Sequence, residues 1–205
     1  MSSSRPALIF DLDGTLTDSM PGIVSCLSKV LDAWHIDSRG PPERFVGPPV
    51  EEWTTDLLPE GTDQARAALA RDYRACYDRE GWKNNSVYAG VAELLAELRE
   101  RGFPLFVCTS KQQHFAVRIL DLFGLSSQFT AIYGDKAEYA SHSKEDLLAR
   151  LLLEHSLAPQ SAWMIGDRIF DIRLNGIRFA MRWVPLKQNT KLSLILCSSC
   201  SWTSS

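Results

Sequence analysis

Residues 7–16 read ALIFDLDGTL, and this stretch decides the fold of the 205-residue chain. The continuous apolar run from Ala7 to Phe10 predicts a strand that is buried on both faces, as strands of parallel sheets are. Two carboxylates, Asp11 and Asp13, follow at once, and Gly14 then allows the backbone to approach a ligand closely. Because open α/β proteins bind ligands at the carboxyl ends of their strands, this loop is expected to line a binding site.

Apolar runs alternate with helical patterns along most of the remaining chain. This alternation predicts an α/β fold, with a Rossmann-like parallel sheet covered by helices on both faces. Apolar residues at helical spacing predict helices over 91–98, 115–123 and 147–152, with glycines ending the first two and a serine capping the third. The expected strands are Ala7–Phe10, Leu105–Cys108, Ala131–Tyr133, Ala162–Ile165 and Ile177–Trp183.

One long segment breaks this alternation, because residues 19–85 contain only helical patterns. We therefore expect a small helical cap domain at 19–85, inserted after the first strand. The core domain is then expected to comprise residues 1–18 and 86–185. Residues 186–205 are rich in serine and are expected to form an irregular tail.

The composition is that of a globular protein, with 45% apolar and 23% charged residues. The formal net charge of −3 argues against a nucleic-acid polymer as partner, since proteins that bind one usually carry a basic excess. The sequence shows neither a signal-peptide core nor a membrane-spanning stretch, so we expect no membrane partner and a cytoplasmic location. Cysteines then stay reduced, and Cys26, Cys76 and Cys108 are expected to be buried apolar side chains.

A second acidic cluster, Asp167 and Asp171, follows a later expected strand. Acids at the start of a helix are unremarkable by themselves. With Asp11 and Asp13, however, they would gather carboxylates at neighbouring strand ends, where a cation is needed to offset their repulsion. Ligands that are all oxygen favour Mg²⁺ over zinc. A calcium loop is excluded, because the twelfth residue from Asp11 is Gly22 rather than a glutamate.

Polar residues elsewhere complete a site for a phosphate group. Thr109 closes an expected strand, where its hydroxyl and the Ser110 backbone N–H can donate to a phosphoryl oxygen. Lys144 opens a helix before the last acidic cluster, where its ammonium can neutralise charge on phosphate. Taken alone, Thr109 is better explained as a strand-end cap and Lys144 as a solvated lysine. Their order around the acidic motifs, however, favours phosphate binding. We include Gly14, at the close-approach turn, in the same set.

These elements, in this order, resemble the haloacid dehalogenase superfamily of phosphohydrolases over about residues 6–176. The D-x-D-G-T-[LV] element is the specific part of the match. The Asp18-Ser19 pair, the inserted helical cap and residues 109–111 (Thr-Ser-Lys) are similar to the phosphoglycolate phosphatase-like branch, which includes 5'-nucleotidases.

The resemblance implies a Mg²⁺-dependent phosphatase that acts on a small phosphomonoester, with nucleoside 5'-monophosphates as the leading substrates. Asp11 would attack phosphorus to form an aspartyl-phosphate, and Asp13 would serve as general acid and then as general base. The cation would be held by Asp11, the Asp13 carbonyl, Asp167 and Asp171.

The resemblance also implies that the cap acts as a lid over the site. Its candidate specificity residues are Arg44, Trp53 and Lys83, although exposed cations and a packed tryptophan are the commoner case. The sequence departs from the family after Asp171, where fewer residues precede the Asn-Gly pair, and after Trp183, where the usual closing strand–helix unit is missing. These departures put stability in doubt more than chemistry.

Three alternatives stay open at this point. A phosphoglycolate phosphatase and a phosphosugar mutase would use the same motifs, since Asp13 serves hydrolysis and transfer alike. A weakly active binding protein with an altered C-terminus is the non-enzymatic alternative. A dehalogenase is disfavoured, because it needs neither the acid at Asp13 nor a metal cluster.

Overall fold

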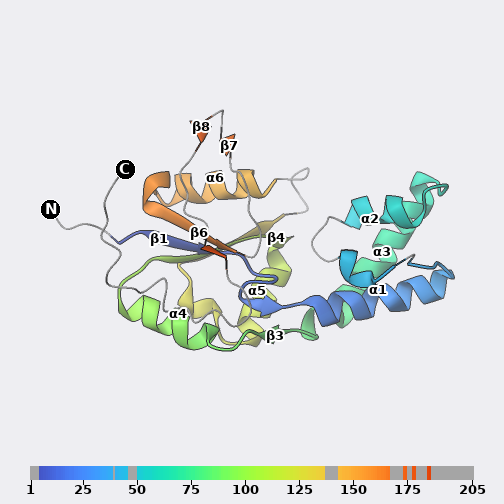
Figure 1. The fold of residues 1–205 in the computed structure, drawn as a ribbon, viewed down its shortest axis with the longest axis horizontal. Helices are drawn as coiled ribbons and strands as arrows, with labels where there is room; N and C mark the ends of the chain where they lie inside the picture. Colours follow the sequence, from blue (N-terminus) through green and yellow to red (C-terminus); the bar gives the residue numbers. More distant parts are fainter. Residues whose placement is uncertain are drawn as a thin grey trace.

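A computed structural model describes the protein over residues 5–38, 40–45, 50–136 and 143–166 and the short segments 173–174, 177–178 and 184–185. In Figure 1 these residues form two lobes, one built around a sheet and the other made of helices. The carboxyl end of β1 (Ala7–Phe10) leads from the first lobe toward the second.

The sheet of the larger lobe has five parallel strands in the order β5-β4-β1-β6-β9. Strand β1 lies at its centre, pairing Phe10 with Val107 on one side and with Ile165 on the other. The chain builds one side of the sheet first and then returns to build the other, so a topological switch point adjoins β1. The other strands are β4 (Leu105–Gln112), β5 (Ala131–Asp135), β6 (Ala162–Gly166) and β9 (Val184–Pro185).

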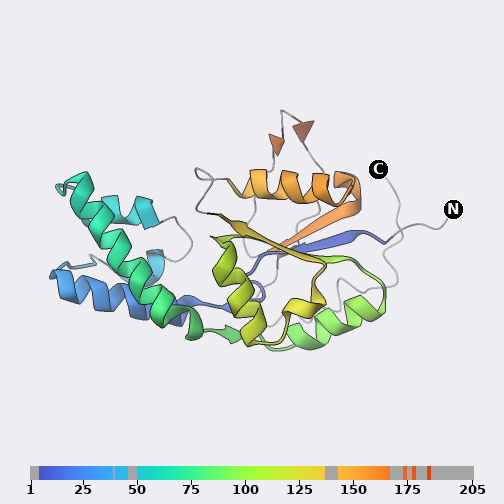
Figure 2. The same ribbon diagram turned by 180° about the vertical axis from the view of Figure 1, so that it is seen from behind.

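Helices cover both faces of this sheet, as Figures 1 and 2 show. Helices α4 (Val91–Glu100) and α5 (Gln113–Leu122) lie on one face, and α6 (Lys144–Glu154) lies on the other. Side chains of β1 alternate between the two cores: Leu8 and Phe10 belong to the first, Ala7 and Ile9 to the second. Burial on both faces explains why the strand is apolar throughout.

The helical lobe is inserted between two short strands, β2 (Thr17–Asp18) and β3 (Ser86–Val87), which pair antiparallel. The chain therefore leaves the core and returns to it through one two-stranded ribbon. We propose 19–85 as the bounds of the cap, with 1–18 and 86–185 as the core. The cap contains α1 (Met20–Trp34), η1 (Pro42–Phe45), α2 (Val50–Leu57), α3 (Asp63–Arg79) and η2 (Gly81–Lys83).

A row of aromatic rings runs through the cap and into the core. Phe45 contacts Trp53 with ring centroids 5.8 Å apart, and Trp53 contacts Tyr73 at 5.0 Å. Tyr73 stacks on Tyr77 at 6.1 Å, and Tyr77 meets Phe115 of α5 edge to face at 5.0 Å. Such aromatic pairs stabilise a fold by more than their buried area alone. The row therefore helps to hold the cap together and connects it to the sheet lobe.

Most elements expected from the sequence are confirmed. Strand β4 runs on to Gln112, and α6 begins with a capping box between Ser143 and Asp146. Gly102 and Gly124 follow α4 and α5 with φ of 78° and 67°, which favour glycine. None of the helices in the described ranges is long and apolar enough to span a bilayer.

The strand expected over 177–183 is confirmed at its first two residues, but not as a strand of the parallel sheet. Ile177–Arg178 (β8) instead pairs antiparallel with Arg173–Leu174 (β7), and β9 provides the fifth strand of the sheet. Asn-Gly separates β7 from β8 in the sequence, and this dipeptide favours a tight hairpin over a continuous strand. Residues 179–183 and the expected tail at 186–205 lie outside the described part of the chain.

Helix α1 and η2 approach so closely that a side chain at Gly22 has no room. A Cβ atom there would lie 2.0 Å from the Gly81 carbonyl oxygen and 2.8 Å from that of Asn84. We expect Gly22→Ala to lower the free energy of unfolding by about 1 to 3 kcal/mol, because these backbones cannot separate without repacking the cap. Urea denaturation followed by circular dichroism measures this loss.

Ser28→Ala, on the same helix but half-buried, is the matched control and should change stability by no more than about 0.5 kcal/mol. Equal stability of Gly22→Ala and the native protein would contradict the close approach.

Candidate active site

Three neighbouring strands end at one edge of the sheet. Asp11 directly follows β1, Thr109 lies in β4, and β6 ends at Gly166. The Asp11 backbone N–H donates to the Ile165 carbonyl oxygen at 2.9 Å, which holds the first carboxylate beside β6. This edge is where the sequence places its candidate catalytic residues.

The loop after β1 folds into a tight turn. The backbone N–H groups of residues 15–17 all donate to the Leu12 carbonyl oxygen, over 2.9 to 3.2 Å. Gly14 has a φ of 78°, and its N–H donates to the Thr17 carbonyl oxygen at 2.8 Å. These bonds position the Asp11 and Asp13 backbone at the carboxyl end of the strand, in a conformation that favours glycine at position 14.

The structure brings Asp11 into direct contact with Lys144, although 133 positions separate them. The Lys144 Nζ donates to Asp11 Oδ2 at 2.6 Å, and the Leu12 N–H donates to Oδ1 at 2.8 Å. Both side chains are almost buried, with exposed fractions of 8% for Lys144 and 12% for Asp11. Burial raises the pKa of the Asp11 carboxyl above its ordinary value, and Lys144 and the Leu12 N–H offset this effect only in part. The lysine therefore favours the ionised carboxylate that a nucleophile needs.

Asp13 is held by a second lysine, Lys111. The Lys111 Nζ lies 2.9 Å from Asp13 Oδ2 and donates to the Tyr77 hydroxyl oxygen, also at 2.9 Å. Burial disfavours the charged form of Lys111, but Asp13 and Tyr77 outweigh this effect and raise the pKa of the ammonium. Because Tyr77 belongs to α3, this chain of contacts joins the cap to the second carboxylate.

Hydroxyl side chains occur in the two segments that carry the carboxylates and Lys111. Thr109 is buried, and its Oγ1 accepts the Lys111 N–H at 3.3 Å, while Ser110 is exposed. Within the described residues, the buried hydroxyls of Thr15 and Thr17 have no hydrogen-bond partner. Buried polar atoms are normally satisfied, so such atoms at one strand end are consistent with a polar ligand.

The donor set at this edge fits a hard cation. Asp13 Oδ1 is buried and, in the part of the chain that the structure describes, has no hydrogen-bond partner. Carboxylate and carbonyl oxygens are the ligands that Mg²⁺ prefers. The two remaining predicted ligands, Asp167 and Asp171, lie outside the described residues; Asp167 follows the last residue of β6 in the sequence.

The three cap residues considered for specificity make contacts within the cap. Arg44 pairs with Asp56 at 3.0 Å and lies over the Phe45 ring, with 4.3 Å from its guanidinium carbon to the ring centroid. Trp53 is packed in the aromatic row, and Lys83 lies over the Trp82 ring. Their roles toward a substrate remain predictions.

Two residues of the site were not predicted to act in it, Lys111 and Tyr77. The sequence did contain a signal that Lys111 lies in the site, because this lysine stands two positions after Thr109 in the strand-end motif. Tyr77 had none beyond its helical periodicity, because only the packing of α3 against α5 brings it to the core.

Comparison with known proteins identifies the family. The sequence model of the haloacid dehalogenase-like hydrolases matches residues 8–180, and the chain belongs to this family. A haloacid dehalogenase-like family hydrolase from Streptococcus pneumoniae has a similar structure, with a TM-score of 0.73, 31% identity and coverage of 82% of this chain and 79% of that one. The predicted superfamily and fold are thereby confirmed.

Curated relatives are named as a kinase, as a 5'-nucleotidase or as phosphatases, among them phosphoglycolate phosphatases. Tyrosine-protein kinase PtkA of Mycobacterium tuberculosis is 41% identical over 173 residues, which are 82% of this chain and 58% of the relative. A 5'-nucleotidase of Pseudomonas aeruginosa is 38% identical over 170 residues, covering 82% of this chain and 76% of the relative. The match thus spans little more than half of PtkA, and most of the nucleotidase.

Removing the lysine from the buried Asp11–Lys144 pair should destabilise the fold. We expect Lys144→Met to lower the free energy of unfolding by about 3 kcal/mol, because it leaves the Asp11 carboxylate buried without its partner. The double variant Lys144→Met/Asp11→Asn should recover more than half of this loss, since it removes the uncompensated charge as well. Urea unfolding of the single and double variants in a chelating buffer measures both quantities. Additive effects of the two substitutions would contradict direct coupling.

Proposed function

We propose that this protein is a Mg²⁺-dependent phosphatase that hydrolyses a small phosphomonoester through an aspartyl-phosphate, with nucleoside 5'-monophosphates as the leading substrates. The observation that carries the proposal is the contact of Asp11 with Lys144, next to Asp13, at the end of β1. A carboxylate beside a buried ammonium is a nucleophile that has a cation next to it for the phosphate that it attacks.

In this mechanism Asp11 attacks phosphorus and the leaving oxygen departs on the opposite side. Asp13 donates a proton to that oxygen, and then accepts one from the water that hydrolyses the aspartyl-phosphate. Lys144 turns from Asp11 Oδ2 to a phosphoryl oxygen as negative charge leaves the carboxylate. Thr109 Oγ1 and the Ser110 N–H hold the other phosphoryl oxygens.

A bound Mg²⁺ would be held by Asp11, the Asp13 backbone carbonyl, Asp167 and Asp171. It would supply positive charge to the phosphoryl oxygens. The chain's own lysines remain necessary, since Lys111 orients Asp13 and Lys144 balances Asp11.

The cap is proposed to act as a lid, with the β2–β3 ribbon as its connection to the core. Tyr77 supports this role, because it touches Lys111 from the cap side while its ring packs on Phe115. Arg44, Trp53 and Lys83 remain proposed specificity residues. Each would have to leave its present contacts within the cap to touch a substrate. We also propose a cytoplasmic location, which is consistent with a small diffusible substrate.

One specific observation favours a second candidate, a protein-tyrosine kinase. The relatives with 41% identity carry that name, and a phosphoryl group can pass from Asp11 to a hydroxyl instead of to water. Phosphoglycolate phosphatase and phosphosugar mutase activities remain alternatives of the same chemistry, and a weakly active binding protein is the non-enzymatic alternative.

Removing the nucleophile tests the mechanism directly. Asp11→Asn should lower Mg²⁺-dependent phosphate release by at least about 10³-fold, because an amide cannot form the acyl phosphate. Asp63→Asn is the matched control: Asp63 lies on the cap with a fully exposed side chain, and its substitution should leave the rate unchanged. A variant Asp11→Asn that releases phosphate at the native rate would remove the proposed nucleophile.

A substrate panel separates the candidates. We expect kcat/KM with Mg²⁺ to be highest for nucleoside 5'-monophosphates and at least about tenfold lower for 2-phosphoglycolate, a difference of about 1.4 kcal/mol in transition-state stabilisation. Phosphate release and transfer of label from the γ-phosphate of ATP to a tyrosine peptide are measured on the same preparation. Label transfer without hydrolysis of any monoester would instead establish the kinase.

A further inference from the structure

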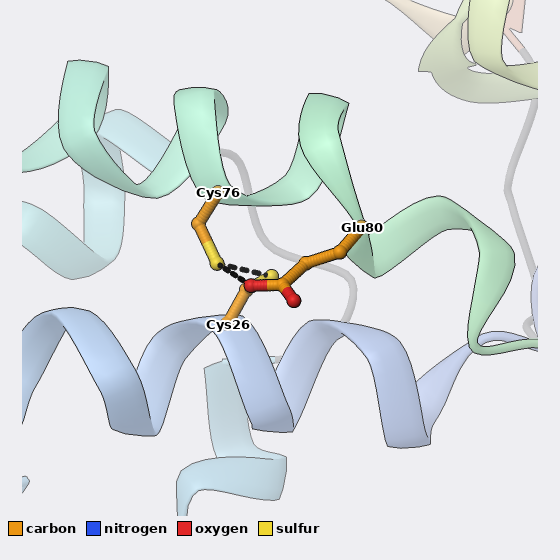
Figure 3. A group of neighbouring side chains, drawn as sticks. All are labelled: Cys26, Cys76 and Glu80. Atoms are coloured by element: carbon orange, nitrogen blue, oxygen red, sulfur yellow. Dashed lines mark hydrogen bonds between the residues drawn. The ribbon is translucent and has the colours of Figure 1, made fainter.

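Two cysteines face each other inside the cap, far along the chain from one another. Cys26 of α1 and Cys76 of α3 are both buried, and their sulfur atoms lie 2.7 Å apart (Figure 3). The Cys76 thiol also lies 3.3 Å from the Glu80 carboxylate, which pairs with Lys29 at 2.9 Å. Neither cysteine has a role in the proposed reaction.

The separation of the two sulfurs favours a covalent bond over a shared metal ion. It is closer to the about 2.05 Å of a disulfide than to the about 3.8 Å between two sulfurs on a tetrahedral zinc at about 2.3 Å. The space beside Cys26 is also filled, since a Cβ on Gly81 would lie 2.8 Å from its sulfur and 2.6 Å from the Tyr77 ring. The two sulfurs need to move closer by well under about 1 Å to form a disulfide, whereas they must move apart by about 1 Å to share a zinc ion.

We propose that Cys26 and Cys76 are an oxidation site at which a peroxide forms a reversible disulfide between α1 and α3. The thiolate of one cysteine attacks a peroxide oxygen, the O–O bond breaks, and a sulfenic acid and one water form. The second thiolate then attacks the sulfenic sulfur and displaces the oxygen as a second water. Two thiols and one hydrogen peroxide thus yield one disulfide and two waters.

The surroundings keep the pair reduced until such an oxidant is present. Burial raises the pKa of the Cys26 thiol to about 12, aided by the neighbouring Cys76. Because the thiolate is the reactive form, spontaneous exchange with weak oxidants is slow at neutral pH. Glu80 and Lys29 lie at the exposed end of the cluster, with side chains 44% and 55% exposed, and mark the side from which a small oxidant enters.

The bond would join two parts of the cap that lie 50 positions apart in the chain. Helix α1 begins two residues after β2, and Cys76 directly precedes Tyr77. Oxidation would therefore restrain the two helices that connect the cap to the catalytic loop and to Lys111. Closing so long a loop constrains the unfolded chain, so the oxidised protein should be the more stable form.

The test uses the full chain, treated with hydrogen peroxide at about pH 8.5, where a larger fraction of the thiols is ionised than at neutral pH. After alkylation, tryptic peptides are separated without reduction and identified by mass. We expect the peptide of residues 75–79 to be linked to the peptide that ends at Lys29, and dithiothreitol to release both. The melting temperature of the oxidised protein should rise by about 5 °C or more.

Cys26→Ser and Cys76→Ser should each abolish the linked peptide and the rise in melting temperature. Cys108→Ser is the matched control, because Cys108 is equally buried but lies in β4, and it should preserve both. If either serine variant fails to fold, the linked peptide and the melting temperature of the native protein still test the proposal. Recovery of Cys26 and Cys76 as alkylated thiols, their linkage to other cysteines, or their protection by Zn²⁺ without a linked peptide would each overturn the proposal.

Discussion

The site depends on neutralising two carboxylates that follow one buried strand. Asp11 and Asp13 are two positions apart, and the sheet that surrounds β1 removes most of the water that would screen them. Lys144, at the start of α6, and Lys111, at the end of β4, supply the two positive charges. Because the lysines come from different segments of the chain, each ion pair also ties a separate part of the core to the catalytic loop. Loss of Lys144 leaves the Asp11 carboxylate buried without its partner, which is costly for the fold and for the chemistry alike.

The cap shares in this arrangement through Tyr77. Its hydroxyl accepts from the same ammonium that pairs with Asp13, and its ring links the aromatic row of the cap to Phe115 of the core. A movement of the cap about the β2–β3 ribbon would change the surroundings of Lys111 and hence of the proposed general acid. The proposed lid movement and the proposed proton transfer are thus joined by one residue, and one of the two paired cysteines, Cys76, directly precedes it on α3.

Local patterns predicted much of the fold. The strands at Ala7–Phe10 and Ala162–Ile165 are buried on both faces and read as continuous apolar runs, and α4 and α5 are followed by glycines with positive φ. The strand expected to begin at Ile177 is present at Ile177–Arg178 but was assigned to the wrong sheet, because an Asn-Gly pair ahead of the apolar run signals a hairpin and an apolar pattern alone does not say which strand a segment joins. Arg44 and Trp53 illustrate a similar limit, since composition marks them as able to bind a substrate while their contacts are with neighbours in the cap.

Short-range sequence patterns are enough to indicate the α/β class, the helical insert, and the loop with Asp11, Asp13 and Gly14, because each depends on residues close together in the chain. Three-dimensional packing adds that Lys144 holds Asp11, that Lys111 connects Asp13 to the cap, and that Cys26 meets Cys76. These contacts join residues tens of positions apart, and they depend on how helices pack on the sheet and on each other. Helical or strand periodicity shows which face of an element is buried, but the partner on that face follows from shape and charge in three dimensions.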